Sequence, residues 1–179
     1  MMTRLFLSHK HKKAAPDVPA SETAQPRRVP ALRSDAVGHI DYKGSSEGKI
    51  IITPHIMEMS RLTGKTVADI KEHMIESAKE YAIQHSCICI LKDARTVVTD
   101  GQKVYINCTG NDGMSTGGCG DVLTGLIAGM TAMGLDAFEA ACLSVYVHGK
   151  AGDYAASGKG RAGMTAADVS EAIAYVLKR

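Results

Sequence analysis

The sequence predicts an α/β fold in which helices stack on one sheet. From residue 49 onward, short apolar runs of strand length alternate with longer runs whose apolar residues recur at helical spacing. The β-branched run Ile50–Ile52 stops at Pro54, and the continuous run Cys87–Leu91 is typical of a strand buried on both faces. Only about three to four strands are recognisable, and a doubly wound sheet contains more, so we expect a fold truncated on its N-terminal side.

The hairpin and the helices follow from the same periodicities. Asp100-Gly101 between two β-branched runs is a strong hairpin signal, which predicts strands over 97–99 and 103–107. Thr66 and Thr165 each precede an acidic residue by three positions, which resembles capping-box spacing at a helix start. We expect a helical turn over 58–64 and helices over 66–84, 121–133, 137–157 and 165–177.

Residues 1–48 differ in composition from the rest of the chain and predict a poorly ordered segment. They contain four of the five prolines, no sustained hydrophobic period, and eight basic against five acidic residues. The stretch up to Lys13 is basic and free of acids, which permits a transit peptide, but an unstructured tail is the favoured interpretation. The expected organisation is a divergent segment over 1–48 and a folded part over 49–179.

Composition excludes several classes of function. The net charge of +2, without a basic face, does not indicate nucleic-acid binding, and the absence of Trp argues against a base-stacking surface. No apolar run approaches the length of a membrane span. The odd number of five cysteines, mostly inside apolar or glycine-rich runs, indicates reduced thiols and a cytoplasmic protein. The pattern His85-x-Cys87-x-Cys89 contains metal-ligating residue types, but the apolar run around it favours a buried strand.

A glycine-rich loop leads into the helix expected from Asp121. The glycines fall at Gly110, Gly113, Gly117, Gly118 and Gly120, and the apolar residues after them recur at helical spacing. The free N–H groups and positive dipole of such a helix start favour an anion. The P-loop and Rossmann patterns are both absent, so this is not a standard nucleotide loop.

Three polar residues are candidates for chemistry. Asp121 fits an ordinary first-turn carboxylate, but beside an anion site it also fits a general base that takes a proton from a hydroxyl. His55 and Lys92 each follow a strand, where ligands of open α/β sheets gather. Either residue could equally have only a structural role, as a loop histidine and a surface lysine.

Several blocks of residues together resemble the ADP/ATP-dependent NAD(P)H-hydrate dehydratase family, a member of the ribokinase-like superfamily. The blocks are Thr53-Pro54-His55-x-x-Glu58-Met59, Leu91-Lys92-x-Ala94-x-Thr96, Asn111-x-Gly113-Met114-x-Thr116-Gly117-Gly118-x-Gly120-Asp121-Val122-Leu123-Thr124-Gly125 and Val145-Tyr146-x-His148-Gly149-x-Ala151-Gly152-Asp153. The resemblance covers about residues 49–179 and implies a ribokinase-like three-layer α/β/α fold. It also implies a metabolite-repair lyase that converts hydrated NADH or NADPH (NADHX, NADPHX) back to the working cofactor.

The resemblance also implies roles for residues. It makes Asp121 the catalytic base, and it places His55 and Asp121 against the hydrated dinucleotide. The adenine nucleotide, ADP or ATP as phosphoryl donor with Mg²⁺, is expected against Lys92, Asp93, Ala94, Arg95, Thr96 and Gly120. Backbone N–H groups of Gly118, Cys119 and Gly120 form the expected anion hole. No side chain is assigned as a metal ligand.

The chain departs from the family pattern at several positions. Ile56-Met57 replaces a Pro-Gly pair after His55, and Asp93 and Arg95 stand where the family usually has glycine. Asp93 adds negative charge where a polyphosphate is expected, which is unfavourable. Residues 1–48 do not match the family's first half, so unpaired strand edges would favour a homo-oligomer. A small-alcohol kinase of the same superfamily and an inactive paralogue that only binds a nucleotide therefore remain as alternatives.

Overall fold

The computed structural model describes residues 31–32 and 50–178, which form one mixed sheet and six α-helices. The strands are β1 (Ala31–Leu32), β2 (Ile50–Ile52), β3 (Cys87–Leu91), β4 (Val97–Thr99) and β5 (Val104–Ile106). The helices are α1 (Ile56–Thr63), α2 (Val67–Glu72), α3 (Met74–His85), α4 (Cys119–Ala132), α5 (Ala137–Lys159) and α6 (Ala166–Leu177), and a 3₁₀ helix, η3, spans Asp112–Ser115. Among these residues, no helix is both long enough and apolar enough to cross a membrane.

The sheet has the strand order β1-β2-β3-β4-β5. β1, β2 and β3 are parallel, with Ile51 opposite Ile88, whereas β3, β4 and β5 are antiparallel neighbours. The β4–β5 pair confirms the predicted hairpin, and Gly101 in its turn has a φ of 94°, a conformation that favours glycine. Two parallel strands therefore end at the same edge of the sheet, where their loops meet.

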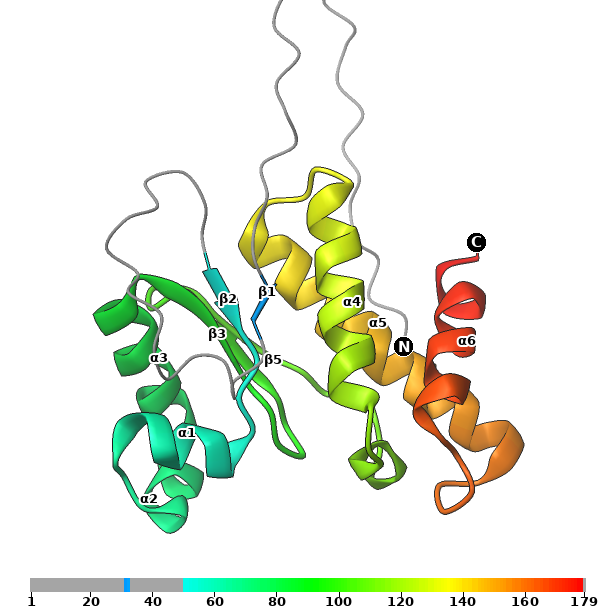
Figure 1. The fold of residues 1–179 in the computed structure, drawn as a ribbon, viewed down its shortest axis with the longest axis horizontal. Helices are drawn as coiled ribbons and strands as arrows, with labels where there is room; N and C mark the ends of the chain where they lie inside the picture. The colour runs from blue at the N-terminus through cyan, green and yellow to red at the C-terminus, as the bar shows by residue number, and fades with distance from the viewer. Residues whose placement is uncertain (1–30, 33–49, 179) are drawn as a thin grey trace, which may run out of the picture.

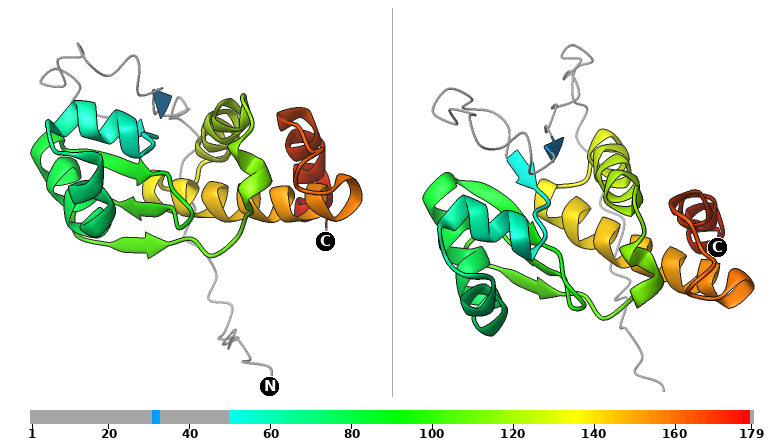
Figure 2. Two further views of the ribbon diagram at one scale, coloured as in Figure 1. Left: turned by 90° about the horizontal axis from the view of Figure 1, so that it is seen from below. Right: turned by 60° about the horizontal axis from the view of Figure 1, so that its bottom comes forward.

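Helices cover both faces of the sheet, as Figures 1 and 2 show. One core cluster joins Ile52, Cys89 and Leu91 to α1, α2 and α3, and the other joins Ile88 and Ile90 to α4 and α5. Alternate residues of β3 point into opposite clusters, which explains why all five are buried and why its sequence is continuously apolar. The α/β prediction with helices stacked on the sheet is confirmed, and α6 packs against α5 at the outer side of this layer.

Some element boundaries differ from the predicted ones. The helix predicted over 66–84 is two helices, because His73 between them leaves the helical region at φ −124° and ψ 49°. The apolar stripe continues through this break, so periodicity alone could not reveal it. α4 begins at Cys119 instead of Asp121, because Gly118 forms its N-cap at a φ of 90°. α1 begins at Ile56 and α5 extends to Lys159.

The strand β1 falls in the segment 1–48, for which poor order was predicted. Its two residues pair in parallel with Ile51 and Ile52 and extend the sheet beyond β2. The rest of that segment lies outside the described residues. At the other end of the chain, the predicted capping box of Thr165 and Asp168 is confirmed at the start of α6.

Candidate functional site

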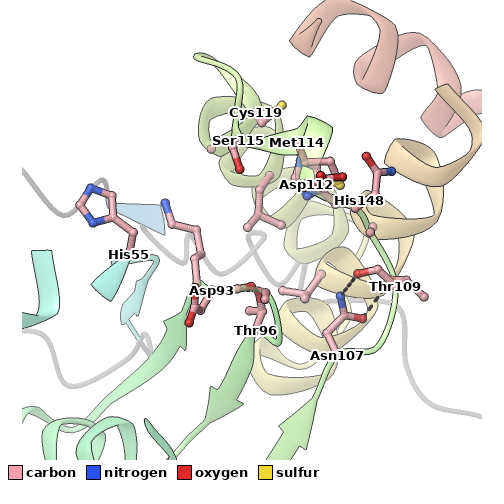
Figure 3. Close-up of a pocket in the computed structure, with 18 of the residues that line it drawn as sticks. His55, Asp93, Thr96, Asn107, Thr109, Asp112, Met114, Ser115, Cys119 and His148 are labelled. Atoms are coloured by element: carbon pink, nitrogen blue, oxygen red, sulfur yellow. Dashed lines mark hydrogen bonds between the residues drawn. The ribbon is translucent and has the colours of Figure 1, made fainter. Parts of the chain in front are cut away.

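A cavity of about 750 Å³ opens at the edge of the sheet where β2 and β3 end. Residues from the strand ends form one side of it, and residues from η3, α4 and α5 form the other side (Figure 3). His55, Asp93 and Thr96 come from the strand ends, while Ser115 and Cys119 face them from the glycine-rich loop and α4. The cavity therefore joins the two parts of the chain in which the sequence placed candidate residues.

The parallel ends of β2 and β3 bring His55 and Lys92 together. The two residues form an isolated parallel bridge, and the N–H of Lys92 donates to the Pro54 carbonyl at 2.8 Å. His55 also caps α1: its Nδ1 accepts from the Glu58 N–H at 3.1 Å, and the Glu58 carboxylate accepts from the His55 N–H at 2.7 Å. His55 thus lines the cavity and caps the start of α1 at the same time.

The start of α4 contributes backbone N–H groups to the cavity. The N–H groups of Asp121 and Val122 donate to the Gly118 carbonyl at 3.0 and 3.1 Å. The helix itself supplies no acceptor for the N–H groups before them, those of Cys119 and Gly120, and both residues line the cavity. A Cβ on Gly120 would lie 3.4 Å from Lys92 Nζ, so the ammonium approaches this first turn closely. Ammonium and free N–H groups together favour an anion here.

The loop after β3 forms the cavity wall beside Lys92. Asp93, Ala94 and Thr96 line the cavity, and Thr96 Oγ1 donates to the Asp93 carbonyl at 3.4 Å. Arg95 is not among the lining residues, and its guanidinium instead donates to Cys108 Sγ at 3.3 Å. The structure therefore brings four of the five predicted residues of this loop to the cavity and turns Arg95 toward the neighbouring loop.

Asn107 and Thr109 after β5 form a wall that the sequence analysis did not identify. Asn107 Nδ2 donates to the Thr109 carbonyl at 2.9 Å, and Thr109 Oγ1 lies 3.0 Å from both Asn107 Oδ1 and the carbonyl of Tyr146 on α5 (Figure 3). Both residues line the cavity. They follow an edge strand without a glycine or charge pattern, so only their position after a strand could have suggested them.

Asp121 and Gly118 do not line the cavity. Asp121 is exposed on the first turn of α4, next in sequence to Gly120, which does line it. Gly118 ends the loop as the helix cap, and a Cβ there would lie 3.1 Å from that of Ala166. Of the three residues predicted to form the anion hole, Cys119 and Gly120 line the cavity, whereas Gly118 is the N-cap of α4 and does not line it.

Two side chains in the cavity wall, the imidazole of His148 and the thiol of Cys119, are uncharged near neutral pH. Burial lowers the pKa of His148 on α5 to about 4, although an interaction with the Cys119 backbone opposes this and the Lys92 charge adds to it. Burial raises the pKa of the Cys119 thiol above its usual value. The sequence analysis assigned no role to His148, which lines the cavity. The positive charge at this end of the cavity therefore comes from Lys92.

Metal ligands are sparse in this site. Among residues 50–178, no group of three or more His, Cys, Asp or Glu side chains could hold a metal ion. Asp93 and Asp112 bring carboxylates to the cavity, and Asp112 also pairs with Arg161 at 3.2 Å. Cys87 and Cys89 are buried in β3, where burial raises the pKa of Cys87 to about 12, so the strand interpretation of that segment is confirmed. Any cation here would need ligands from a bound molecule.

Volume and charge together define what the cavity can take. About 750 Å³ is within the usual range for small-molecule and cofactor sites. One end carries Lys92 and the first-turn N–H groups of α4, and Leu123 and Val145 add apolar surface to the lining. Such a cavity suits a ligand that has both an anionic group, such as a phosphate, and an apolar part.

Known proteins match this chain in sequence. The family model described as NAD(P)H-hydrate dehydratase matches residues 20–175. A bifunctional NAD(P)H-hydrate repair enzyme Nnr of Moorella thermoacetica is 50% identical over 133 residues, which are 73% of this chain and 25% of that protein. An ADP-dependent (S)-NAD(P)H-hydrate dehydratase of Neisseria meningitidis is 34% identical over 73% of this chain and 45% of its own length. The chain thus spans about a quarter to less than half of these relatives.

Solved structures match the fold. The ADP/ATP-dependent NAD(P)H-hydrate dehydratase of Bacillus subtilis, co-crystallized with ATP/Mg²⁺, has a TM-score of 0.72 and 34% identity over 75% of this chain and 49% of that one. A ribokinase-like superfamily protein of Enterococcus faecalis has a TM-score of 0.63 and 29% identity over 72% of this chain and 44% of that one. The ribokinase-like prediction for the fold is therefore confirmed.

Proposed function

This chain belongs to the NAD(P)H-hydrate dehydratase family, and on that premise we propose that it supports the nucleotide-dependent dehydration of NADHX and NADPHX. In this reaction the hydroxyl group that marks a hydrated nicotinamide ring is removed, and the working NADH or NADPH is restored. The reaction consumes ADP or ATP as phosphoryl donor. The chain is then an enzyme of metabolite repair, in keeping with the names of its relatives.

One observation carries this proposal. Lys92 and the first-turn N–H groups of Cys119 and Gly120 converge at one end of the 750 Å³ cavity, although they come from segments that are far apart in the chain. Ammonium and backbone N–H groups are the donors that stabilise a transferring phosphoryl group. This geometry supports the placement of the terminal phosphate beside the start of α4.

The side chains have the following proposed roles. Asp121 takes the proton of the ring hydroxyl, whose oxygen then attacks the terminal phosphoryl group. The phosphorus–oxygen bond to the rest of the nucleotide breaks, which leaves AMP from ADP or ADP from ATP. The phosphate then leaves the ring, pushed by the lone pair of the ring nitrogen, and loss of a ring proton restores the double bond. His55 at the cavity edge contacts the hydrated dinucleotide.

The cavity wall contains carboxylates that are suitable ligands for a divalent cation. Asp93 and Asp112 are the carboxylates that would hold Mg²⁺, because this ion takes one or two carboxylates and completes its shell with phosphates and water. A Mg²⁺ ion bound with the nucleotide would offset the negative charge of the phosphates. The carboxylate of Asp93, unfavourable beside a bare polyphosphate, is then compatible with the site.

A second candidate function is nucleotide binding without turnover. The position of Asp121 favours it, because the proposed base is exposed and does not line the cavity. In that case Lys92 and the start of α4 would bind ADP or ATP, but no hydroxyl would be deprotonated.

The test is to incubate the full chain with hydrated NADH, Mg²⁺ and either ADP or ATP, and to follow NADH absorbance together with nucleotide consumption. A dehydratase yields one NADH for each nucleotide consumed, and it does so only with the correct donor. Nucleotide binding measured by calorimetry without NADH formation would favour the second candidate. Neither binding nor turnover would contradict both.

A further inference from the structure

An ion pair joins the cavity wall to the turn between α5 and α6. Arg161 lies in this turn, and its guanidinium donates to Asp112 Oδ1 at 3.2 Å, across 49 positions of the chain. Asp112 is the first residue of η3 and lines the cavity, whereas Arg161 is not among the lining residues. The Asp112 side chain is 78% exposed, so a bound molecule and its counter-ions can reach this carboxylate.

Backbone packing holds the arginine-bearing turn against η3. A Cβ on Gly113 would collide with the carbonyl oxygen of Arg161 and would lie 2.6 Å from Met164 Sδ, so glycine is required for this close approach. Lys159 at the end of α5 pairs with Asp168 at the start of α6, which ties the two ends of the turn together. The main chain therefore places Arg161 beside Asp112 independently of the ion pair.

Asp112 then has two cations that can use the same carboxylate. A guanidinium forms charge-assisted hydrogen bonds with carboxylates, and Mg²⁺ takes one or two carboxylates together with phosphates and water. Two cations on one carboxylate repel each other, so each should weaken the binding of the other. Asp112 is one of the two carboxylates that we proposed above as ligands for Mg²⁺.

We infer that Arg161 is a positioning residue that competes with the divalent cation for Asp112 and thereby sets how strongly nucleotide binding depends on the metal. This inference rests on the proposed function, because it takes a metal–nucleotide complex as the ligand of the cavity. Without the metal, Arg161 offsets the negative charge of Asp112 beside the phosphate chain. When the metal binds Asp112, the ion pair weakens.

The test measures how much Mg²⁺ strengthens ADP binding. Calorimetry on the full chain gives the Kd for ADP with EDTA and with excess Mg²⁺, and the ratio of the two is the gain from the metal. Arg161→Gln should raise this ratio about two- to fivefold, because the competing charge is lost. Asp112→Asn should lower the ratio. Adding Arg161→Gln to Asp112→Asn should change it no further, because both residues act on one contact.

Lys150→Gln is the matched control. It removes the same charge from an exposed position of α5 that does not line the cavity, so the ratio should stay that of the wild type. An unchanged or lower ratio in Arg161→Gln would overturn the inference. An increase that persists in full when Asp112→Asn is also present would overturn it as well.

A second measurement needs no variant. In wild-type protein saturated with ADP, adding Mg²⁺ should shift the NMR resonance of the Arg161 Nε–H group, and an unchanged resonance would overturn the inference. The expected ratios without NADH formation from hydrated NADH would sink the dehydratase and leave Arg161 assigned. NADH formation with a ratio that Arg161→Gln does not change would do the reverse.

Discussion

The carboxylate of Asp153 on α5 accepts a hydrogen bond from the N–H of Gly110 at 3.1 Å. Its other oxygen accepts from Asn111 Nδ2 at 3.2 Å, and Asn111 Oδ1 accepts from the Gly113 N–H at 3.1 Å. Gly110 has a φ of 100°, so the chain turns sharply where Asp153 holds it. One side chain of α5 therefore fixes the loop that carries the cavity wall into η3.

Asp153→Ala should loosen this loop. Two hydrogen bonds to the carboxylate are lost, so we expect a decrease in unfolding free energy of about 1 to 3 kcal/mol, together with weaker nucleotide binding. Denaturant titration gives the first quantity, and hydrogen exchange at Gly110 reports the loop directly. Glu139→Ala, which removes an exposed acid from the first turn of the same helix, is the control: it should leave exchange at Gly110 unchanged and cost less than about 1 kcal/mol of stability. Unaltered hydrogen exchange at the Gly110 amide would contradict the role of Asp153 in holding this loop.

Gly149→Ala should disturb the same wall through steric crowding. A Cβ at this buried position would lie 2.7 and 2.8 Å from the carbonyl carbon and oxygen of Thr109, which are backbone atoms. Overpacking of this kind costs about 1 to 3 kcal/mol and should also weaken nucleotide binding. Gly158→Ala on the same helix has no atom within 4 Å, so it should leave binding intact and stabilise by up to about 1 kcal/mol. Similar thermal unfolding of the two variants would refute this packing.

His55 should show two separable effects. His55→Asn retains an acceptor suited to an N-cap, so stability should stay near that of the wild type, while the imidazole at the cavity edge is lost. His55→Ala also removes the cap and should lower the unfolding free energy by about 0.5 to 2 kcal/mol. The expected outcome is impaired NADHX turnover in both variants, with loss of stability only in His55→Ala. Full turnover in His55→Asn would limit His55 to its capping role.

The acid stability of the chain should depend on Asp168. Its carboxylate accepts from Lys159, and the N–H and hydroxyl of Thr165 add further hydrogen bonds, so its pKa falls from 3.8 to about 2. Because the folded pKa is the lower one, this stabilisation is present above pH 3.8 and is lost as the pH falls toward 2. Thermal unfolding followed across this window should show a steeper loss in the wild type than in Asp168→Asn. Parallel curves for the two proteins would contradict the prediction.

The sequence specified the sheet more fully than the cavity. β3 and the β4–β5 hairpin could be predicted because continuous apolar runs and an Asp-Gly turn have few alternatives. β1, with two residues, offers no periodicity to detect, and the break at His73 leaves the apolar stripe intact. Local sequence patterns therefore located the longer helices and strands. They did not reveal a strand too short to show a period, or a helix break that leaves the apolar period unchanged.

The candidate site was predictable where the chain ends a strand or carries glycines. His55, Lys92 and Gly120 were found in this way, and all three line the cavity. His148 lies in a block that carries the family resemblance, but the sequence assigned it no role, because its surroundings come from Cys119 and Lys92, which are distant along the chain. Local spacing cannot show which side chains long-range contacts bring to a cavity.

The most direct test of the proposed function is NADH recovery by wild type and Asp121→Asn in parallel, with hydrated NADH, Mg²⁺ and the preferred nucleotide. Asn keeps the size of the side chain but cannot accept a proton from the ring hydroxyl. We expect nucleotide-dependent recovery in the wild type, a loss of at least about a hundredfold in the variant, and equal nucleotide affinity in both. Equal rates in the two proteins would remove Asp121 from the chemistry. No recovery by folded, nucleotide-bound wild type would contradict the dehydratase itself.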